Sequence, residues 1–362
     1  MGATVVADTK AGWRTRAAAA TDRFNQWGQQ MLERLREITQ RVPGLRQQSL
    51  PQNQLGLALL PNGLSLAGVQ RAVGATPRLT RCEYYPLSRQ ADPGLTLRTV
   101  VLQHGIERAA SFRLVLNPDE YQLHLVESPD VPDSELREAV RWRIKDLIDF
   151  PVDEAAIDVF DMPQQAGTGR ETGKLMCVVV ARNPVIAQKA AMVNRSGGEL
   201  DVIDITDLAL RNLLALTPAD ATGVALLYVE PAYSLILITG ESTLYLSRRI
   251  WIGANELASL AGHDPQSGEF RRVADALAME LLRSLEYYEA HFSRPPVESL
   301  YIAPLGSAEP VLHSYLSQAI GVEVQSLDLN RLLETSEPLS AEQQARSLLA
   351  IGAALRHERA TL

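Results

Sequence analysis

Apolar residues recur every three or four positions through residues 13–42, from Trp13 to Val42. This period predicts one long amphipathic helix, which ends before Pro43-Gly44 and is followed by a polar linker. Arginines flank the stripe, so three interpretations stay open: packing on the chain's own lobe, self-association as a coiled coil, or contact with an anionic membrane surface. The residues that would make the last two contacts are Trp13, Phe24, Trp27, Met31 and Leu35.

From Leu55 onward the pattern changes to short strand-like runs. Three such runs, at 54–60, 63–70 and 78–85, are separated by Pro-Asn-Gly and Gly-Ala-Thr-Pro turns. The same theme restarts at Gly223, with runs near 224–229, 233–239 and 242–250. A repeated three-strand meander indicates two lobes of one plan.

Helices and strands alternate after each meander. In the first lobe we predict strands at 112–116, 121–126, 175–181 and 199–205, and helices at 133–148, from 183, and at 206–216. In the second we predict helices at 269–292, 309–320 and 341–356, and strands at 299–303 and 322–327. The fold class is therefore α/β, with the two-lobed plan of actin, Hsp70 and the sugar kinases (ribonuclease H-like). The predicted domains are 1–53 (N-terminal helix and linker), 54–221 (first lobe, with an insertion at about 110–165) and 222–362 (second lobe).

Charge is unevenly distributed along the 362 residues. Of the net charge of −8, residues 1–50 contribute +4, which leaves −12 on the remainder. A body this acidic argues against nucleic acid as a partner. Cys82 and Cys177 lie too far apart for a disulfide framework and fit a reducing compartment. With neither an apolar run long enough to span a bilayer nor a secretory signal, we expect a cytoplasmic location.

Four segments resemble the PilM family of type IV pilus assembly proteins over about residues 54–358. The most specific is 136–159, in which a helix with an Ala-Val-Arg-Trp core runs into a Phe-Pro turn and an acidic strand, as in the family's insertion subdomain. Residues 201–210, 276–292 and 348–355 are similar to family segments in both lobes. The sequence looks closest to the agglutinin (MSHA) biogenesis branch, MshI-like, and differs from GspL-type secretion proteins in lacking a membrane segment.

The resemblance implies an assembly role at the inner membrane. Proteins of this family bind the cytoplasmic tail of a bitopic membrane partner (PilN-like or equivalent) near the insertion subdomain. We therefore predict a partner-binding surface at Arg141, Trp142, Lys145 and Phe150, against the alternative of a solvated helix with Trp142 in the core. The chain would lie at the periphery of the inner membrane, and a homo-oligomer stays open.

The nucleotide loops expected of this fold have lost their functional residues. The first should end in Asp-x-Gly-Ser/Thr, but Ala58 replaces the acid and Pro61 has no amide to donate, although Gly63 follows. The second reads Tyr228-Val-Glu230-Pro, which directs a carboxylate at phosphate. The adenosine loop reads Ala-Pro304-Leu-Gly306 in place of Gly-Gly.

A pseudo-ATPase without catalytic residues is therefore predicted. Binding of ATP with magnesium is disfavoured, and the alternative is an active actin-like ATPase or a nucleotide-binding regulator of pilus assembly. No metal site is predicted either: the histidines lack ligand spacing, and Asp201, Asp204 and Asp207 fit structural roles at a strand and a helix start.

Overall fold

The computed structural model describes most of the chain from residue 54 onward. The described ranges are 54–72, 74–88, 90–104, 106, 111–165, 174–261, 268–305 and 309–356. The predicted N-terminal helix with Trp13, Phe24, Trp27, Met31 and Leu35 lies outside these ranges, as does Gly306. Residues Pro51–Leu362 form one compact unit.

The first lobe is built on a five-stranded sheet in the order β3-β2-β1-β4-β8. β1 (Gln54–Leu60), β2 (Gly63–Gln70) and β3 (Arg78–Pro86) form the predicted antiparallel meander. β4 (Ser111–Leu116) pairs in parallel with β1, and β8 (Glu199–Ile205) pairs in parallel with β4. The outermost strand, β8, is therefore an edge strand.

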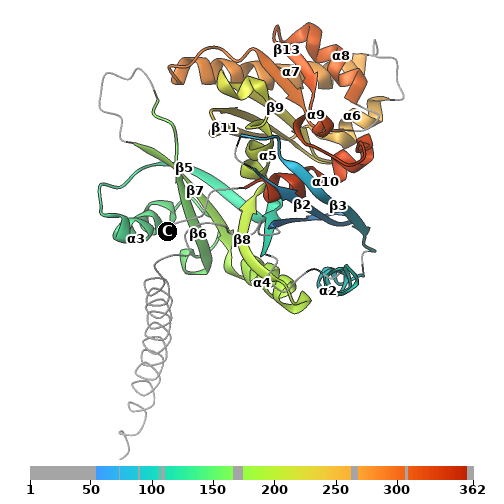
Figure 1. The fold of residues 1–362 in the computed structure, drawn as a ribbon. Helices are drawn as coiled ribbons and strands as arrows, with labels where there is room; N and C mark the ends of the chain where they lie inside the picture. Colours follow the sequence, from blue (N-terminus) through green and yellow to red (C-terminus); the bar gives the residue numbers. More distant parts are fainter. Residues whose placement is uncertain are drawn as a thin grey trace, which may run out of the picture. The chain divides into compact units, whose positions relative to one another are not determined.

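The second lobe repeats this order with β11-β10-β9-β12-β13. β9 (Val224–Val229), β10 (Ser234–Gly240) and β11 (Thr243–Ile250) form the second meander. β12 (Ser299–Ile302) and β13 (Glu323–Ser326) add parallel strands. The repetition that the sequence predicts from its two meanders thus extends to all five strands, and the edge strands of this sheet are β11 and β13 (Figure 1).

Helices cover the sheets. α2 (Pro93–Gln103) and α4 (Asn183–Ser196) pack side by side in the first lobe, and α6 (Ala254–Ala261), α7 (Gly268–His291) and α8 (Glu309–Ala319) cover the second. The sequence analysis did not predict α2. It is short, and only one narrow side of it, including Leu97 and Val100, is buried.

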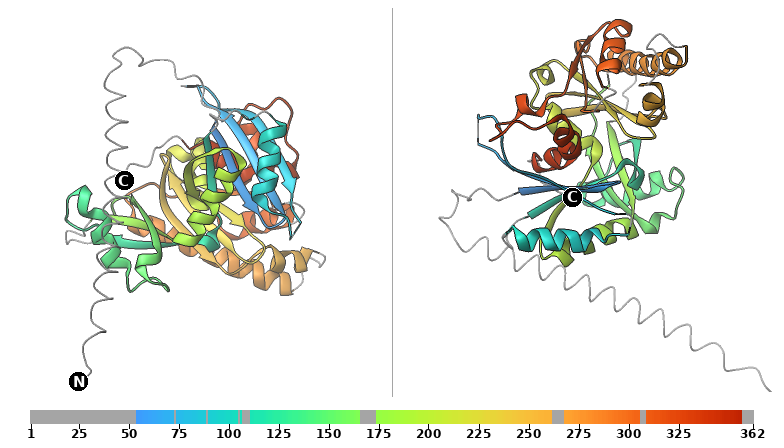
Figure 2. Two further views of the ribbon diagram at one scale, coloured as in Figure 1. Left: turned by 90° about the horizontal axis from the view of Figure 1, so that it is seen from below. Right: turned by 90° about the vertical axis from the view of Figure 1, so that its right-hand side faces the viewer.

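Two further helices, α5 (Thr206–Leu214) and α10 (Ala341–Ala354), pack together between the lobes, next to the short α9 (Leu329–Leu332). Glycine allows this close approach: a Cβ on Gly56 of β1 would lie 1.8 Å from the carbonyl oxygen of Ala350, and one on Gly352 would lie 2.3 Å from that of Ala209. Figure 2 shows α10, in red, against the blue strands of the first sheet.

The insertion is a three-stranded antiparallel sheet in the order β5-β7-β6, packed against α3 (Asp133–Ile144). Its strands are β5 (Tyr121–Glu127), β6 (Ala155–Asp161) and β7 (Leu175–Arg182). These limits differ from the predicted 110–165, because β4 belongs to the first sheet and β7 is the central strand of the insertion. α3 also ends four residues before its predicted end, in a tight turn in which the amides of Leu147 and Ile148 both donate to the carbonyl of Ile144.

Candidate functional site

The first predicted phosphate loop is the tight turn between β1 and β2. Ala58 is only 1% exposed, so its methyl group is buried at the position where the expected loop would have a carboxylate. Gly63 has a local steric reason to be glycine, because a Cβ there would lie 2.4 Å from the ring of Tyr84. Together with Pro61, which has no amide hydrogen, this hairpin offers little to a phosphate group.

The second loop lies between β9 and β10. The hydroxyl of buried Tyr228 donates a hydrogen bond to the Glu230 carboxylate, and the Glu230 amide donates to the Tyr233 carbonyl over 2.8 Å. The Glu230 carbonyl accepts from the amide of Ala254 at the start of α6, also over 2.8 Å. The backbone amide and carbonyl of Glu230 are thus both engaged in hydrogen bonds within the second lobe. A phosphate group at this loop would meet the Glu230 carboxylate rather than a free Glu230 amide.

In the third loop, after β12, the amide of Ala303 donates to Leu227 of β9 over 2.9 Å, and that of Leu305 donates to the Glu309 carboxylate over 3.2 Å. Pro304 has no amide hydrogen. Among the described residues of this loop (303–305), the backbone amides are therefore engaged within the second lobe or, at Pro304, missing.

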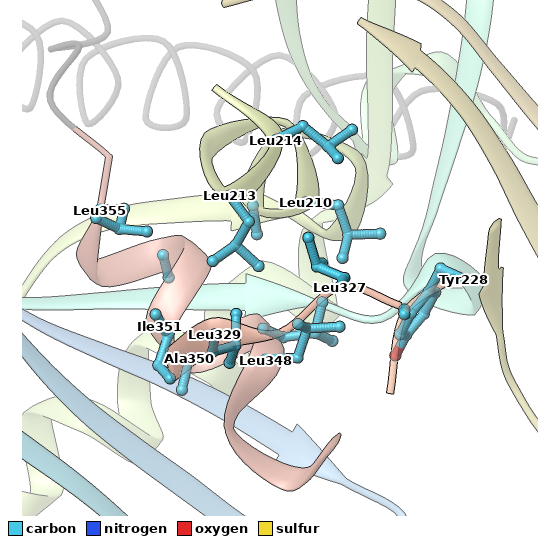
Figure 3. Close-up of a cluster of buried hydrophobic side chains, with 14 of the residues drawn as sticks. Leu210, Leu213, Leu214, Tyr228, Leu327, Leu329, Leu348, Ala350, Ile351 and Leu355 are labelled. Carbon is cyan, nitrogen blue, oxygen red and sulfur yellow. The ribbon is translucent and has the colours of Figure 1, made fainter. Parts of the chain in front are cut away.

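Residues from all three loops belong to one apolar cluster. Ala58, Tyr228 and Ala303 share it with leucines from α5, α9 and α10, including Leu210, Leu329 and Leu348 (Figure 3). One residue of each predicted loop therefore packs into the same apolar cluster. None of the grooves described below is lined by Ala58 or Tyr228.

Hydrogen bonds also join the lobes across this region. Asp207, at the start of α5, accepts from the hydroxyls of Tyr121 in the insertion and Ser247 in β11. Arg249 of β11 donates to the Pro118 carbonyl and lies 3.5 Å from the Asp119 carboxylate, in the 3₁₀ turn between β4 and β5. Side chains of the insertion, α5 and β11 thus connect the two lobes here.

Glu230→Gln is expected to raise the melting temperature at pH 7 but not at pH 4. Burial raises the pKa of Glu230, and Asp119 raises it further, although the Tyr228 hydrogen bond opposes this. A carboxyl group with a raised folded-state pKa destabilises the fold as pH rises from its unfolded pKa through the folded one, and a neutral amide avoids that cost. Differential scanning fluorimetry at the two pH values measures the effect. Glu286→Gln, at an exposed position, serves as the control. An equal rise of the melting temperature at both pH values would contradict a raised pKa of Glu230 as the cause.

The four predicted partner-binding residues do not form one surface. Arg141 donates to the carbonyls of Val152 and Ala155 over 3.1 and 3.4 Å, and so holds the turn before β6. Phe150 is buried beneath the Arg182 guanidinium. Trp142 is 68% exposed, with the Lys145 ammonium 5.6 Å from its ring centroid. The alternative that placed Trp142 in the core is therefore wrong, because the other side of α3, with Val140 and Ile144, fills it.

A groove of about 680 Å³, which the sequence did not predict, lies between the insertion and the first sheet. Six consecutive residues of β6 (156–161) and four of β8 (202–205) line this β6–β8 groove. Because alternate residues of a strand face opposite sides, a lining of consecutive residues means that the groove runs along the strand edges. β6 and β8 are both edge strands of their sheets (Figure 1).

The lining of the β6–β8 groove combines aliphatic side chains with polar and charged ones. The aliphatic side chains include Ile186 of α4, Val202 of β8, Leu208 of α5 and Leu244 of β11. Lys174 and Asp161, paired at 2.6 Å, are exposed residues of the lining. An unpaired strand edge beside apolar side chains is the arrangement that accepts an added extended peptide segment.

A buried ion pair lines the same groove. The Arg356 guanidinium lies 2.8 Å from Oδ1 of Asp204, whose Oδ2 has no hydrogen-bond partner among the described residues. Burial raises the pKa of Asp204 and outweighs the opposing effect of Arg356. Asp201 is half exposed and lies 3.7 Å from Arg113, and Asp207 bridges the lobes, so the three aspartates serve separate structural roles. The described residues contain no group of three potential metal ligands.

The architecture of two similar lobes around α5 and α10 is that of the actin-like ATPases, as the sequence predicts. Among solved structures, the chain is similar to one from the "PilM-PilN type IV pilus biogenesis complex", with a TM-score of 0.64 and 20% identity over 84% of this chain and 98% of that one. No family model and no curated relative matches.

Two further solved structures are more distant. A Bacteroides thetaiotaomicron protein with an actin-like ATPase fold and unknown function has a TM-score of 0.45 and 8% identity, over 78% of this chain and 93% of that one. The cytoplasmic domain of EpsL, an inner membrane component of the type II secretion system of Vibrio cholerae, has a TM-score of 0.43 and 12% identity, over 84% and 96%. In the described part of this chain, no helix meets the length and hydropathy needed to cross a bilayer.

Proposed function

We propose that this chain is a non-catalytic assembly protein of a type IV pilus inner-membrane platform. It holds an extended cytoplasmic segment of a PilN-like bitopic membrane protein in the β6–β8 groove. The observation that carries the proposal is that two strand edges line one groove, together with both aliphatic and polar side chains. The overall similarity to a chain of a PilM–PilN complex supports the choice of partner.

The bound segment adds a strand beside β6 or β8. Main-chain hydrogen bonds to the edge supply affinity, and alternate aliphatic side chains of the segment contact residues such as Val202 and Leu208. Binding between the insertion and the first lobe places the protein at the cytoplasmic face of the inner membrane through its partner. The agglutinin (MSHA) pilus is the system we propose, and pilus platform genes are expected to flank the gene.

The direct test is a pull-down from detergent-solubilised native membranes with the full chain as bait and quantitative mass spectrometry. A bitopic pilus platform protein with a short cytoplasmic segment should be enriched over beads that carry an unrelated acidic protein of similar size. A synthetic peptide of that segment should then compete with the full-length partner. If no bitopic protein is enriched, or the segment does not compete, the proposed function fails.

Nucleotide is not required in this proposal. We expect isothermal titration with ATP and magnesium to give a Kd no tighter than about 1 mM, because the three loops offer packed apolar groups and the Glu230 carboxylate in place of free amides. Micromolar binding would favour the alternative of an active actin-like ATPase. A matched titration with AMP separates adenosine binding from phosphate binding.

A further inference from the structure

A second groove, of about 570 Å³, lies on the second lobe between β11 and α7. Five consecutive residues at the end of β11 and just beyond it (248–252) form one wall, and Ala276, Met279, Glu280 and Arg283 of α7 form the other. β11 is one of the two edge strands of its sheet. As in the β6–β8 groove, the consecutive lining places a strand edge along this β11–α7 groove. The two grooves have no lining residue in common.

Two of the large apolar side chains that the described surface exposes meet in this groove. Trp251 is 71% exposed and Met279 is 49% exposed. The Trp251 ring packs edge-on against Tyr233, with centroids 6.2 Å apart, and the Arg249 guanidinium lies 5.9 Å from it. An indole that is positioned by its neighbours yet open to solvent loses little conformational entropy on contact with a partner.

Charge gives the groove a second distinguishing property. Its lining includes Arg248, Arg249 and Arg283 but one carboxylate, Glu280. Arg248 and Arg283 both pair with that carboxylate, at 3.2 and 2.6 Å, so two guanidinium groups share one negative charge. Arg249 also lies 3.5 Å from Asp119, so the three arginines exceed the two carboxylates by one charge, whereas residues beyond position 50 carry a net −12. Arginine beside tryptophan suits an acidic ligand that also carries an apolar side chain.

We propose that the β11–α7 groove binds an acidic, extended segment of a partner protein. The segment adds a strand to the edge of β11, its carboxylates pair with Arg248 and Arg283, and one large apolar side chain packs between Trp251 and Met279. A protein segment fits better than an anionic lipid surface, because a strand edge offers main-chain hydrogen bonds that lipid does not use. This contact is independent of the β6–β8 groove.

A displayed library of random 12-residue peptides, selected on the full chain and counter-selected on Trp251→Ser, tests the proposal. Enriched peptides should carry net negative charge and an aromatic or long aliphatic residue. A synthetic enriched peptide should lose about tenfold or more in affinity on Trp251→Ser and on Arg283→Glu, and should weaken as salt rises. Both substituted side chains are exposed, so the variants should keep the fold.

Trp142→Ser, which removes an exposed tryptophan outside the groove, is the matched control and should leave peptide affinity unchanged. The proposal is overturned if no peptide is retained on the wild type over Trp251→Ser, if enriched peptides are basic, or if Arg283→Glu binds them equally well. It is also overturned if no peptide is enriched but phosphatidylglycerol vesicles bind the wild type and not Arg283→Glu, which identifies a lipid site instead.

Discussion

Val202→Arg is expected to weaken binding of the partner's cytoplasmic segment by about 100-fold. Val202 lies on the edge strand β8, lines the β6–β8 groove and is partly buried. A guanidinium there must either stay desolvated against aliphatic side chains or occupy the space of the incoming strand, and each costs several kcal/mol. Fluorescence anisotropy with a labelled synthetic segment measures the change.

Leu102→Arg is the matched control for this substitution. Leu102 is 70% exposed on α2 and is not part of the groove, so the same change of chemistry should leave the affinity within about twofold. Circular dichroism and the melting temperature establish that both variants fold. Equal affinities for Val202→Arg and the wild type would show that the segment binds elsewhere.

Asp204→Ala is expected to lower the free energy of unfolding by about 3 kcal/mol. The side chain is fully buried and its carboxylate lies 2.8 Å from the Arg356 guanidinium, so the substitution leaves a buried cation without that counter-charge. The carboxylate also accepts the amide hydrogen of Ile205, at the junction of β8 and α5. Urea unfolding followed by circular dichroism gives the free energy.

The control is Asp201→Ala on the same strand. Asp201 is 49% exposed and 3.7 Å from Arg113, so its loss should cost less than about 1 kcal/mol. The sequence predicts opposite faces for the two aspartates by strand alternation, but a register shift at Asp201 interrupts the alternation, and both aspartates interact with Arg113. If the two variants lose equal stability, the buried pair contributes less than its geometry indicates.

The doubled meander made the fold predictable from sequence. Period-two runs, interrupted by turns such as Pro61-Asn62-Gly63, fix local strands, and their repetition after Gly223 indicates two lobes. The limits of the insertion were harder to predict. β7 reads as a buried strand, but a local pattern carries no information on which of two sheets a strand joins.

The candidate sites show the same distinction between local and long-range information. The substitutions at Ala58, Glu230 and Pro304 are visible in the sequence because the fold fixes where those loops occur. The β6–β8 groove is not visible in the sequence. It depends on two strand edges that line one groove although their strands lie about 40 residues apart in the chain. Trp142 was correctly placed on α3, but its exposure depends on which face the three-stranded sheet covers.

Hydrogen–deuterium exchange of the full chain, with and without the cytoplasmic segment of the bitopic partner, tests whether that segment occupies the β6–β8 groove. We predict protection of the amides of β6 and β8, because an added strand hydrogen-bonds to an edge and excludes water from the groove. The β1–β2 turn and the loop at Glu230 should exchange at the same rate in both samples. Protection of those loops, or of the exposed face of α3 around Trp142, with unchanged exchange in β6 and β8, would contradict the account.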